Sequence, residues 1–285
     1  MKTLPVNVWN PSGSDEGFLP NHSQNWWFDP AFPHAFELFD LDSFYEDNYF
    51  KTDHVNQAVA KVYVDSVLHY GGLFHKTPVT SVLEAGCGGG WFTKEFMDRK
   101  IDILALEGTK AGLAQTARKG IPPERLLKHD LRLPLDLNRR FQVAVCTEVA
   151  EHIECPFAGQ LVKTLTNHAD VVWFSFEPPG TNDPHYHHCN EQPFKFWLNL
   201  FKFYGYQAAE IPDELVQKLA GRGRYIFYNA NVDLPAGLAR ADSTSSSVAL
   251  GQPVSERKGR RLIRKLLPPI IRDWIYFIRK GKPRN

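Results

Sequence analysis

Cysteine is scarce in this sequence, and a long apolar segment is missing altogether. The four cysteines, at positions 87, 146, 155 and 189, are too widely spaced for a disulfide framework or for paired zinc knuckles. No run approaches the ~18–20 uncharged apolar residues of a membrane-spanning helix, and the first residues lack the apolar core of a signal peptide. We therefore expect a cytoplasmic globular protein. Its 285 residues suffice for one large domain with extensions or for two small domains.

The net charge is also close to zero, but only because the opposite charges of two regions cancel. The whole chain has a formal charge of +1. Residues 256–285 carry 11 Lys and Arg against 2 Asp and Glu, a local charge of +9, and the remaining 22 basic and 30 acidic side chains give −8. The sequence therefore combines a mildly acidic body with a basic tail.

Large apolar side chains are interleaved with the cations of this tail. Trp274 and Phe277 lie on one side of Pro268 and Pro269, and the two prolines divide the segment into short pieces. Such a basic amphipathic segment suits an anionic membrane surface, so peripheral membrane attachment is one hypothesis. Packing on its own domain or on a partner explains the same pattern. Nucleic acid is disfavoured, because aliphatic and aromatic side chains fit lipid better.

β-branched and apolar runs alternate with helical patterns from residue 53 onwards. Strands are predicted over residues 80–84, 101–106, 126–129, 141–146, 171–176 and 224–230, and helices over residues 53–70, 91–99, 110–118, 157–167 and 193–204. Strands that alternate with helices of about ten residues form parallel βαβ units. The pattern predicts an α/β fold, with a doubly wound, Rossmann-like and mostly parallel sheet flanked by helices.

Composition divides the chain into four parts. Residues 1–50 include ten aromatic residues between positions 26 and 50, so this extension is expected to wrap onto the next domain. There it either forms a lid over an acceptor pocket or completes the core. Residues 51–235 are expected to form the α/β domain, residues 236–255 a linker and residues 256–285 the basic tail.

A glycine-rich turn follows the first predicted strand of the domain. Gly86, Gly88 and Gly90 stand at the mouth of a helix, where glycine lets the backbone turn sharply and a ligand approach closely. The next strand ends in Glu107, a position suited to accept hydrogen bonds from a ribose diol. These features predict an adenosine-type cofactor. The glycine spacing differs from the dinucleotide-binding pattern, and Glu84 stands where it can meet a cationic ammonium, so both details favour S-adenosyl-L-methionine.

Three segments resemble class I S-adenosylmethionine-dependent methyltransferases. Glu-Ala-Gly-Cys-Gly-Gly-Gly at residues 84–90 is similar to the first motif of that family, and Thr-Glu-Val-Ala-Glu-His-Ile at residues 147–153 resembles a segment of its small-molecule branch. His-Asp-Leu at residues 129–131 lies where the family places an acidic residue against adenine. The resemblance implies that the domain binds S-adenosylmethionine and transfers its methyl group.

The same resemblance assigns roles to individual residues. It implies that Gly86, Gly88 and Gly90 line the methionine and ribose and that Glu107 holds the ribose hydroxyls. Asp130 and Leu131 are implied to contact the adenine, and Thr147, Glu148 and Glu84 to complete the cofactor site. The alternatives are structural, since Glu107 could cap the next helix and Asp130 could begin a turn.

Histidines are concentrated in the loop after the fifth predicted strand, residues 177–193. Its end, His-Cys-Asn-Glu-Gln-Pro, resembles a His-x-Asn-Glu-x-Pro segment of methyltransferases from bacterial polysaccharide and secondary-metabolite pathways. An imidazole here could be the general base for an acceptor hydroxyl. His185, Cys189 and Glu191 are also ligand types for zinc or iron. However, His187 and His188 point apart in an extended backbone, so we expect no metal. A purely structural loop is the third alternative.

His188 is the first candidate for the base because it matches the family-like segment, and His152 and His187 are the other candidates. The sequence therefore predicts methyl transfer from S-adenosylmethionine to a hydroxyl of a small-molecule or glycan-type acceptor, in polysaccharide or secondary-metabolite biosynthesis. An RNA or protein methyltransferase stays open as an alternative. So does a non-catalytic cofactor-binding scaffold in a membrane-associated assembly.

Overall fold

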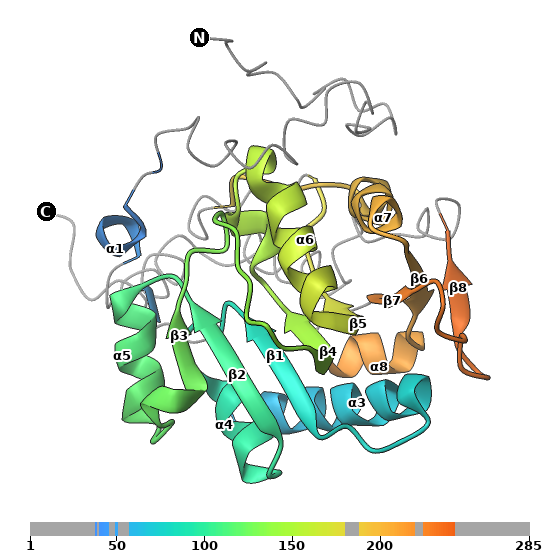
Figure 1. Cartoon of the computed structure of the whole chain (residues 1–285), viewed down its shortest axis with the longest axis horizontal. Coiled ribbons are helices and arrows are strands. Elements are labelled where there is room, and N and C mark those ends of the chain that lie inside the picture. Colours follow the sequence, from blue (N-terminus) through green and yellow to red (C-terminus); the bar gives the residue numbers. More distant parts are fainter. Residues whose placement is uncertain are drawn as a thin grey trace, which may run out of the picture. The chain divides into compact units, whose positions relative to one another are not determined.

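The α/β domain is seen in a computed structural model of the chain (Figure 1). The structure describes residues 38, 40–45, 49–50, 57–179, 188–219 and 225–242. The basic tail, most of the N-terminal extension, and His185 and His187 of the histidine-rich loop lie outside the described residues. The expectations for these parts therefore stay predictions.

Eight strands form one sheet, in the order β3-β2-β1-β4-β5-β7-β6-β8. Neighbouring strands from β3 to β5 pair in parallel, whereas β7 is antiparallel to both β5 and β6, and β8 is antiparallel to β6. The strands are β1 (Ser81–Ala85), β2 (Asp102–Glu107), β3 (Leu126–Lys128), β4 (Phe141–Cys146), β5 (Ala169–Phe174), β6 (Tyr206–Glu210), β7 (Tyr225–Asn229) and β8 (Ala239–Ala241). The predicted α/β fold with a mostly parallel sheet is confirmed.

Helices cover both faces of the sheet (Figure 1). They are α1 (Leu41–Phe44), α3 (Gln57–His75), α4 (Trp91–Asp98), α5 (Lys110–Arg118), α6 (Ala158–His168), α7 (Phe194–Phe203) and α8 (Asp213–Lys218). Side chains of α3, α4 and α8 share one core with the sheet, and α6 and α7 pack against the other face. Short 3-10 turns add η4 (Pro123–Arg125), η5 (Ala150–His152) and η6 (Cys155–Phe157).

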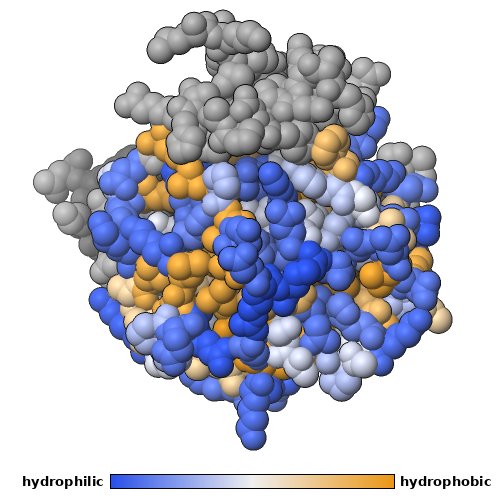
Figure 2. Space-filling model, viewed as in Figure 1, coloured by the Kyte–Doolittle hydropathy of each residue, from blue (hydrophilic) through white to orange (hydrophobic). Residues whose placement is uncertain are grey.

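Aromatic rings fill the core on both faces. On the first face, Tyr63 of α3 stacks on Phe92 of α4, with ring centroids 4.2 Å apart. On the other, Phe201 of α7 stacks on Phe227 of β7 at 3.8 Å. The surface in Figure 2 is mostly hydrophilic with scattered apolar patches, as expected for a globular domain. Four aromatic residues of α7 are buried in this core and have a structural role, namely Phe194, Phe196, Trp197 and Phe201.

The structure differs from the predicted elements at the second half of the domain. β6 and α8 were not predicted from the sequence. Residues 239–241 fall in the predicted linker, but they form β8 and pair with β6. The helix predicted over residues 53–70 continues to His75. Among the residues that the structure describes, no helix has the length and apolar character needed to cross a membrane.

Candidate active site beyond the ends of β1, β2 and β4

The order in which strands are added to the sheet reverses between β1 and β4. From β1 the chain builds outward through β2 and β3, and it then returns to place β4 and β5 on the opposite side. In open α/β sheets, ligands bind beyond the carboxyl ends of the strands at such a switch point. Two cavities with about 580 and 620 Å³ of empty space share Gly86, Gly88 and Glu148 there.

The three glycines of the loop have left-handed backbone conformations, with φ of 79° at Gly86, 51° at Gly88 and 79° at Gly90. A Cβ on Gly86 would lie 2.5 Å from Cγ2 of Val149, and one on Gly90 would lie 2.7 Å from Cγ2 of Thr116. A Cβ on Gly88 would instead meet nothing nearer than Phe50, at 3.9 Å. Packing therefore requires the outer two glycines, whereas Gly88 leaves the cavity open for a ligand.

Glu84 of β1 contributes a buried carboxyl group to the wall of the first cavity. Its Oε2 accepts a 2.6 Å hydrogen bond from the hydroxyl of Thr93 on α4. Burial raises the pKa of Glu84 to about 8, against the opposing effect of the Thr93 hydroxyl. A cation bound in this cavity would favour the ionised carboxylate, so the position fits an ammonium group.

Glu107 ends β2 and lines the second cavity. Its Oε2 accepts the Gly88 N–H at 2.9 Å, and its Oε1 accepts both the N–H and the hydroxyl of Thr109, at 2.9 and 2.7 Å. Burial raises the pKa of this carboxyl group, while the Thr109 bonds lower it. Thr109, not Glu107, caps α5. The carboxylate is thus held in one orientation against the glycine loop.

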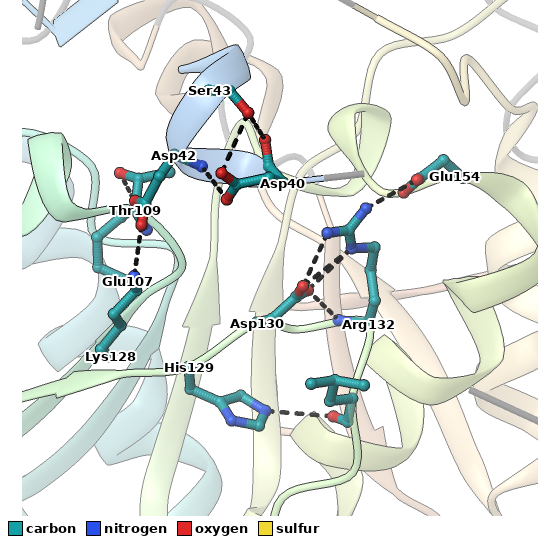
Figure 3. Close-up of polar contacts among 11 residues, drawn as sticks. Asp40, Asp42, Ser43, Glu107, Thr109, Lys128, His129, Asp130, Arg132 and Glu154 are labelled. Atoms are coloured by element: carbon teal, nitrogen blue, oxygen red, sulfur yellow. Dashed lines mark hydrogen bonds and ion pairs between the residues drawn. The ribbon is translucent and has the colours of Figure 1, made fainter. Parts of the chain in front are cut away.

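Asp130 and Leu131 lie on the wall of the same cavity. The carboxylate of Asp130 accepts hydrogen bonds from Nε of Arg132 at 3.0 Å and from Nη2 at 2.8 Å. Arg132 is only 1% exposed, and its Nη1 donates to Glu154 at 3.0 Å (Figure 3). Asp130 also begins the turn that the sequence analysis considered, because its carbonyl accepts the Leu133 N–H. An ion pair with Arg132 therefore fixes the predicted adenine contact.

Helix α1 brings part of the N-terminal extension to the second cavity, where Leu41 and Tyr45 line the wall. Asp42 attaches this helix to the domain, because its carboxylate accepts the backbone N–H of Lys110 at 2.5 Å. The same carboxylate accepts a hydrogen bond from the ammonium of Lys128 at 2.7 Å (Figure 3). The Lys128 hydrogen bond holds the pKa of Asp42 well below its usual range. The extension thus forms a wall of the cavity at these residues.

Thr147 and Glu148 follow β4. The hydroxyl of Thr147 is hydrogen-bonded to that of Tyr63. Glu148 has a left-handed φ of 57°, which is rare outside glycine and is often found at functional sites. Ser175 holds it in place, accepting the Glu148 N–H at 2.8 Å and donating to Oε1 at 3.0 Å. Glu148 is thereby fixed at a position where it lines both cavities.

His152 in η5 also lines the second cavity, between two tyrosines and a second histidine. The hydroxyls of Tyr45 and Tyr49 lie 3.4 and 3.5 Å from its Nδ1 and Nε2. The ring centroid of His188 lies 5.0 Å away, edge to face. The structure therefore brings together two of the three candidate bases, and His187 lies outside the described residues.

All nine residues predicted for the cofactor line one or both cavities. The sequence analysis missed the residues that hold them in place, above all Thr109 and Arg132, and it assigned no role to Glu151. Thr109 had a usable signal, since threonine before a helical pattern is a common N-cap. The position of Arg132 two residues after Asp130 was also a local signal for their ion pair, whereas its bond to the distant Glu154 could not be predicted from the sequence.

No family model and no curated protein matches this sequence. Solved structures do match, each with low identity. DesVI from Streptomyces venezuelae is 18% identical over 70% of this chain and 100% of that chain, with a TM-score of 0.47. The sugar N-methyltransferase KedS8 from Streptoalloteichus is 14% identical over 64% of this chain and 92% of its own, with a TM-score of 0.49. The magnesium protoporphyrin IX methyltransferase ChlM from Synechocystis, with bound SAH, is 13% identical over 73% and 94%, with a TM-score of 0.45. At these identities and scores, the matches carry no activity over to this chain.

Proposed function

We propose that the protein is a class I methyltransferase that uses S-adenosylmethionine. The supporting observation is the position of two buried carboxyl groups beside one glycine loop, with Glu84 on the first cavity and Glu107 on the second. S-adenosylmethionine has an ammonium group at one end and a ribose diol near the other. A carboxylate suits each of these groups, and Gly88 leaves space for the chain that joins them.

When bound, S-adenosylmethionine supplies an electrophilic methyl group on a sulfonium. The residues of the chain bind and orient it. Glu107 accepts hydrogen bonds from the ribose hydroxyls, and Asp130 and Leu131 border the adenine. Tyr45 and Phe50 add aromatic rings to the wall of the second cavity, and a ligand bound against such rings is less exposed to water. Orientation of the two reactants supplies much of the rate in such a transfer.

We further propose that the acceptor is a hydroxyl of a small molecule or a glycan. Alkyl hydroxyls hold their protons tightly at neutral pH, so transfer needs a group that assists loss of the proton. His152 on the cavity wall and His188 beside it provide imidazoles for this step. As the oxygen attacks, the C–O bond forms, the C–S bond breaks with its electron pair left on sulfur, and the proton leaves the oxygen.

A pair of variants tests the proposal. Formation of S-adenosylhomocysteine is measured with a panel of polyhydroxylated small molecules and oligosaccharides, and affinity for S-adenosylmethionine is measured by calorimetry. We expect His188→Ala to lower turnover by about 10²–10⁴-fold and to leave the affinity unchanged. His69→Ala, an exposed histidine on α3, is the matched control and should change neither. Near-normal turnover of His188→Ala would contradict the role of the imidazoles, and absence of binding by the unaltered chain would contradict the function.

A further inference from the structure

Three potential metal ligands meet at the turn after β4. Glu151 and His152 belong to η5, and His188 belongs to the segment that precedes α7. One ligand atom from each residue can be chosen so that all three lie within 4.8 Å of one another. We propose that Glu151, His152 and His188 bind one divalent transition-metal ion beside the second cavity.

Backbone hydrogen bonds bring these distant residues together. The N–H groups of Cys189 and Asn190 both donate to the carbonyl of Glu151, at 2.9 and 3.0 Å. The side-chain amide of Asn190 donates to the carbonyl of Ala150 at 3.4 Å, and Asn190 itself is buried. The last part of the histidine-rich loop is therefore attached to η5 at Glu151, the residue before His152. The position of His188 is thus a consequence of the fold.

Glu151 is the strongest indication of a bound cation. Its side chain is 1% exposed, and neither carboxylate oxygen has a hydrogen-bond partner among the residues that the structure describes. A buried, unpaired carboxylate is costly unless a cation or donors compensate it. A metal ion would supply the missing positive charge.

The surroundings of the His188 imidazole also fit a metal site. Oε1 of Glu191 lies 3.3 Å from Nδ1 of His188. Carboxylates commonly orient metal-bound histidines in this way and raise their basicity. Two imidazoles and one carboxylate suit Mn²⁺, Fe²⁺, Co²⁺ or Zn²⁺ better than Ca²⁺ or Mg²⁺, which prefer oxygen ligands. Three protein ligands also leave positions open for a substrate oxygen.

A catalytic role for the ion rests on the proposed methyltransferase function, whereas binding of the ion to these three residues does not depend on that function. His152 lines the second cavity, so an ion on its imidazole would face an acceptor bound there. An acceptor hydroxyl on the ion would lose its proton to water more readily, because the cation stabilises the alkoxide. His152 and His188 would then assist loss of the proton as ligands of the ion, and this role would replace direct proton acceptance by the imidazoles. The proposed cofactor and acceptor class would stay the same.

Cobalt binding tests the site directly. The full chain is stripped with a chelator and titrated with Co²⁺, whose absorption bands report nitrogen and oxygen ligands, and the bound metal is counted after equilibrium dialysis. We expect one Co²⁺ per chain. Glu151→Gln, which keeps the size of the side chain, and His188→Ala should each weaken binding by at least about tenfold. The exposed His69→Ala is the matched control and should bind as the unaltered chain does.

Two results would overturn the metal site. One is a chain that binds no Co²⁺, and the other is Co²⁺ binding that both variants leave unchanged. If Glu151→Gln does not unfold cooperatively, His188→Ala decides, because His188 lies outside the helices and strands. A chain that binds S-adenosylmethionine but no Co²⁺ contradicts the metal site alone. A chain that binds Co²⁺ but no S-adenosylmethionine contradicts the proposed function alone.

Discussion

Replacing Gly86 with alanine should destabilise the domain by an amount that the geometry of the glycine loop defines. Gly86 has φ of 79°, and an added Cβ would lie 2.5 Å from Cγ2 of Val149. The left-handed conformation costs an L-residue about 1–2 kcal/mol. Overpacking of a well-packed site adds about 1–3 kcal/mol. We therefore expect Gly86→Ala to lower the free energy of unfolding by about 2–5 kcal/mol.

Gly120 provides the matched control for the backbone contribution. Its φ is 78°, nearly that of Gly86, but an added Cβ would meet no atom within 4 Å. Gly120→Ala should therefore lose only the conformational part, about 1–2 kcal/mol. Urea denaturation of the full chain, followed by tryptophan fluorescence, gives both free energies of unfolding. The difference between the two variants isolates the steric conflict with Val149.

A double variant tests whether Val149 is the obstacle. Val149→Ala removes both Cγ atoms that lie closest to the added Cβ, so Gly86→Ala should cost less in that background. We also expect Gly86→Ala to weaken binding of S-adenosylmethionine, because the glycine loop must shift to make room for the alanine side chain. Equal losses of stability for Gly86→Ala and Gly120→Ala would refute the steric reasoning, and so would strictly additive effects in the double variant.

Three further predictions concern the carboxyl groups around the cavities. Glu107→Gln replaces a carboxylate acceptor by an amide of the same shape. Calorimetry should show that the affinity for S-adenosylmethionine falls about 10–100-fold, and an unchanged affinity would exclude the ribose contact. Glu84 has a pKa of about 8 in the free chain, so binding an ammonium should release its proton. Affinity should therefore rise with pH towards about 8, and the same rise in Glu84→Gln would assign the proton to another group. Asp42→Asn should lower the free energy of unfolding by at most about 1 kcal/mol, because its partners Lys110 and Lys128 are exposed. Asp42→Asn should also weaken cofactor binding, because α1 brings Leu41 and Tyr45 to the second cavity. Unaltered affinity in calorimetry would contradict this role of Asp42.

Local sequence patterns predicted the half of the domain that binds the proposed cofactor. Strands β1, β2 and β4 are apolar runs bounded by charges or glycines, and each was predicted to within one residue at either end. The left-handed backbone at Gly86 and Gly90 requires glycine, so the loop is visible as a glycine pattern. The sequence could therefore locate the cofactor residues at the ends of these strands.

Tertiary contacts determined what the sequence analysis missed. β6 reads Tyr-Gln-Ala-Ala-Glu, a stretch with little β-propensity, and it is a strand because β7 and β8 pair with it on either side. The same holds for the cluster of Glu151 and His188. The sequence pattern indicated metal-ligand types only within the histidine-rich loop, whereas the structure joins one residue of that loop to two residues of η5. Residues so far apart in the sequence meet only through the tertiary structure, so their proximity could not be predicted from local patterns.

Competition between two adenosine-type cofactors tests the central claim most directly. The full chain is titrated in a calorimeter with S-adenosylmethionine, first alone and then in the presence of NAD. The positions of Glu84 and Glu107 predict one S-adenosylmethionine per chain and no competition by NAD, because NAD has no ammonium group for the first cavity. Absence of S-adenosylmethionine binding, or its displacement by NAD, would contradict the account.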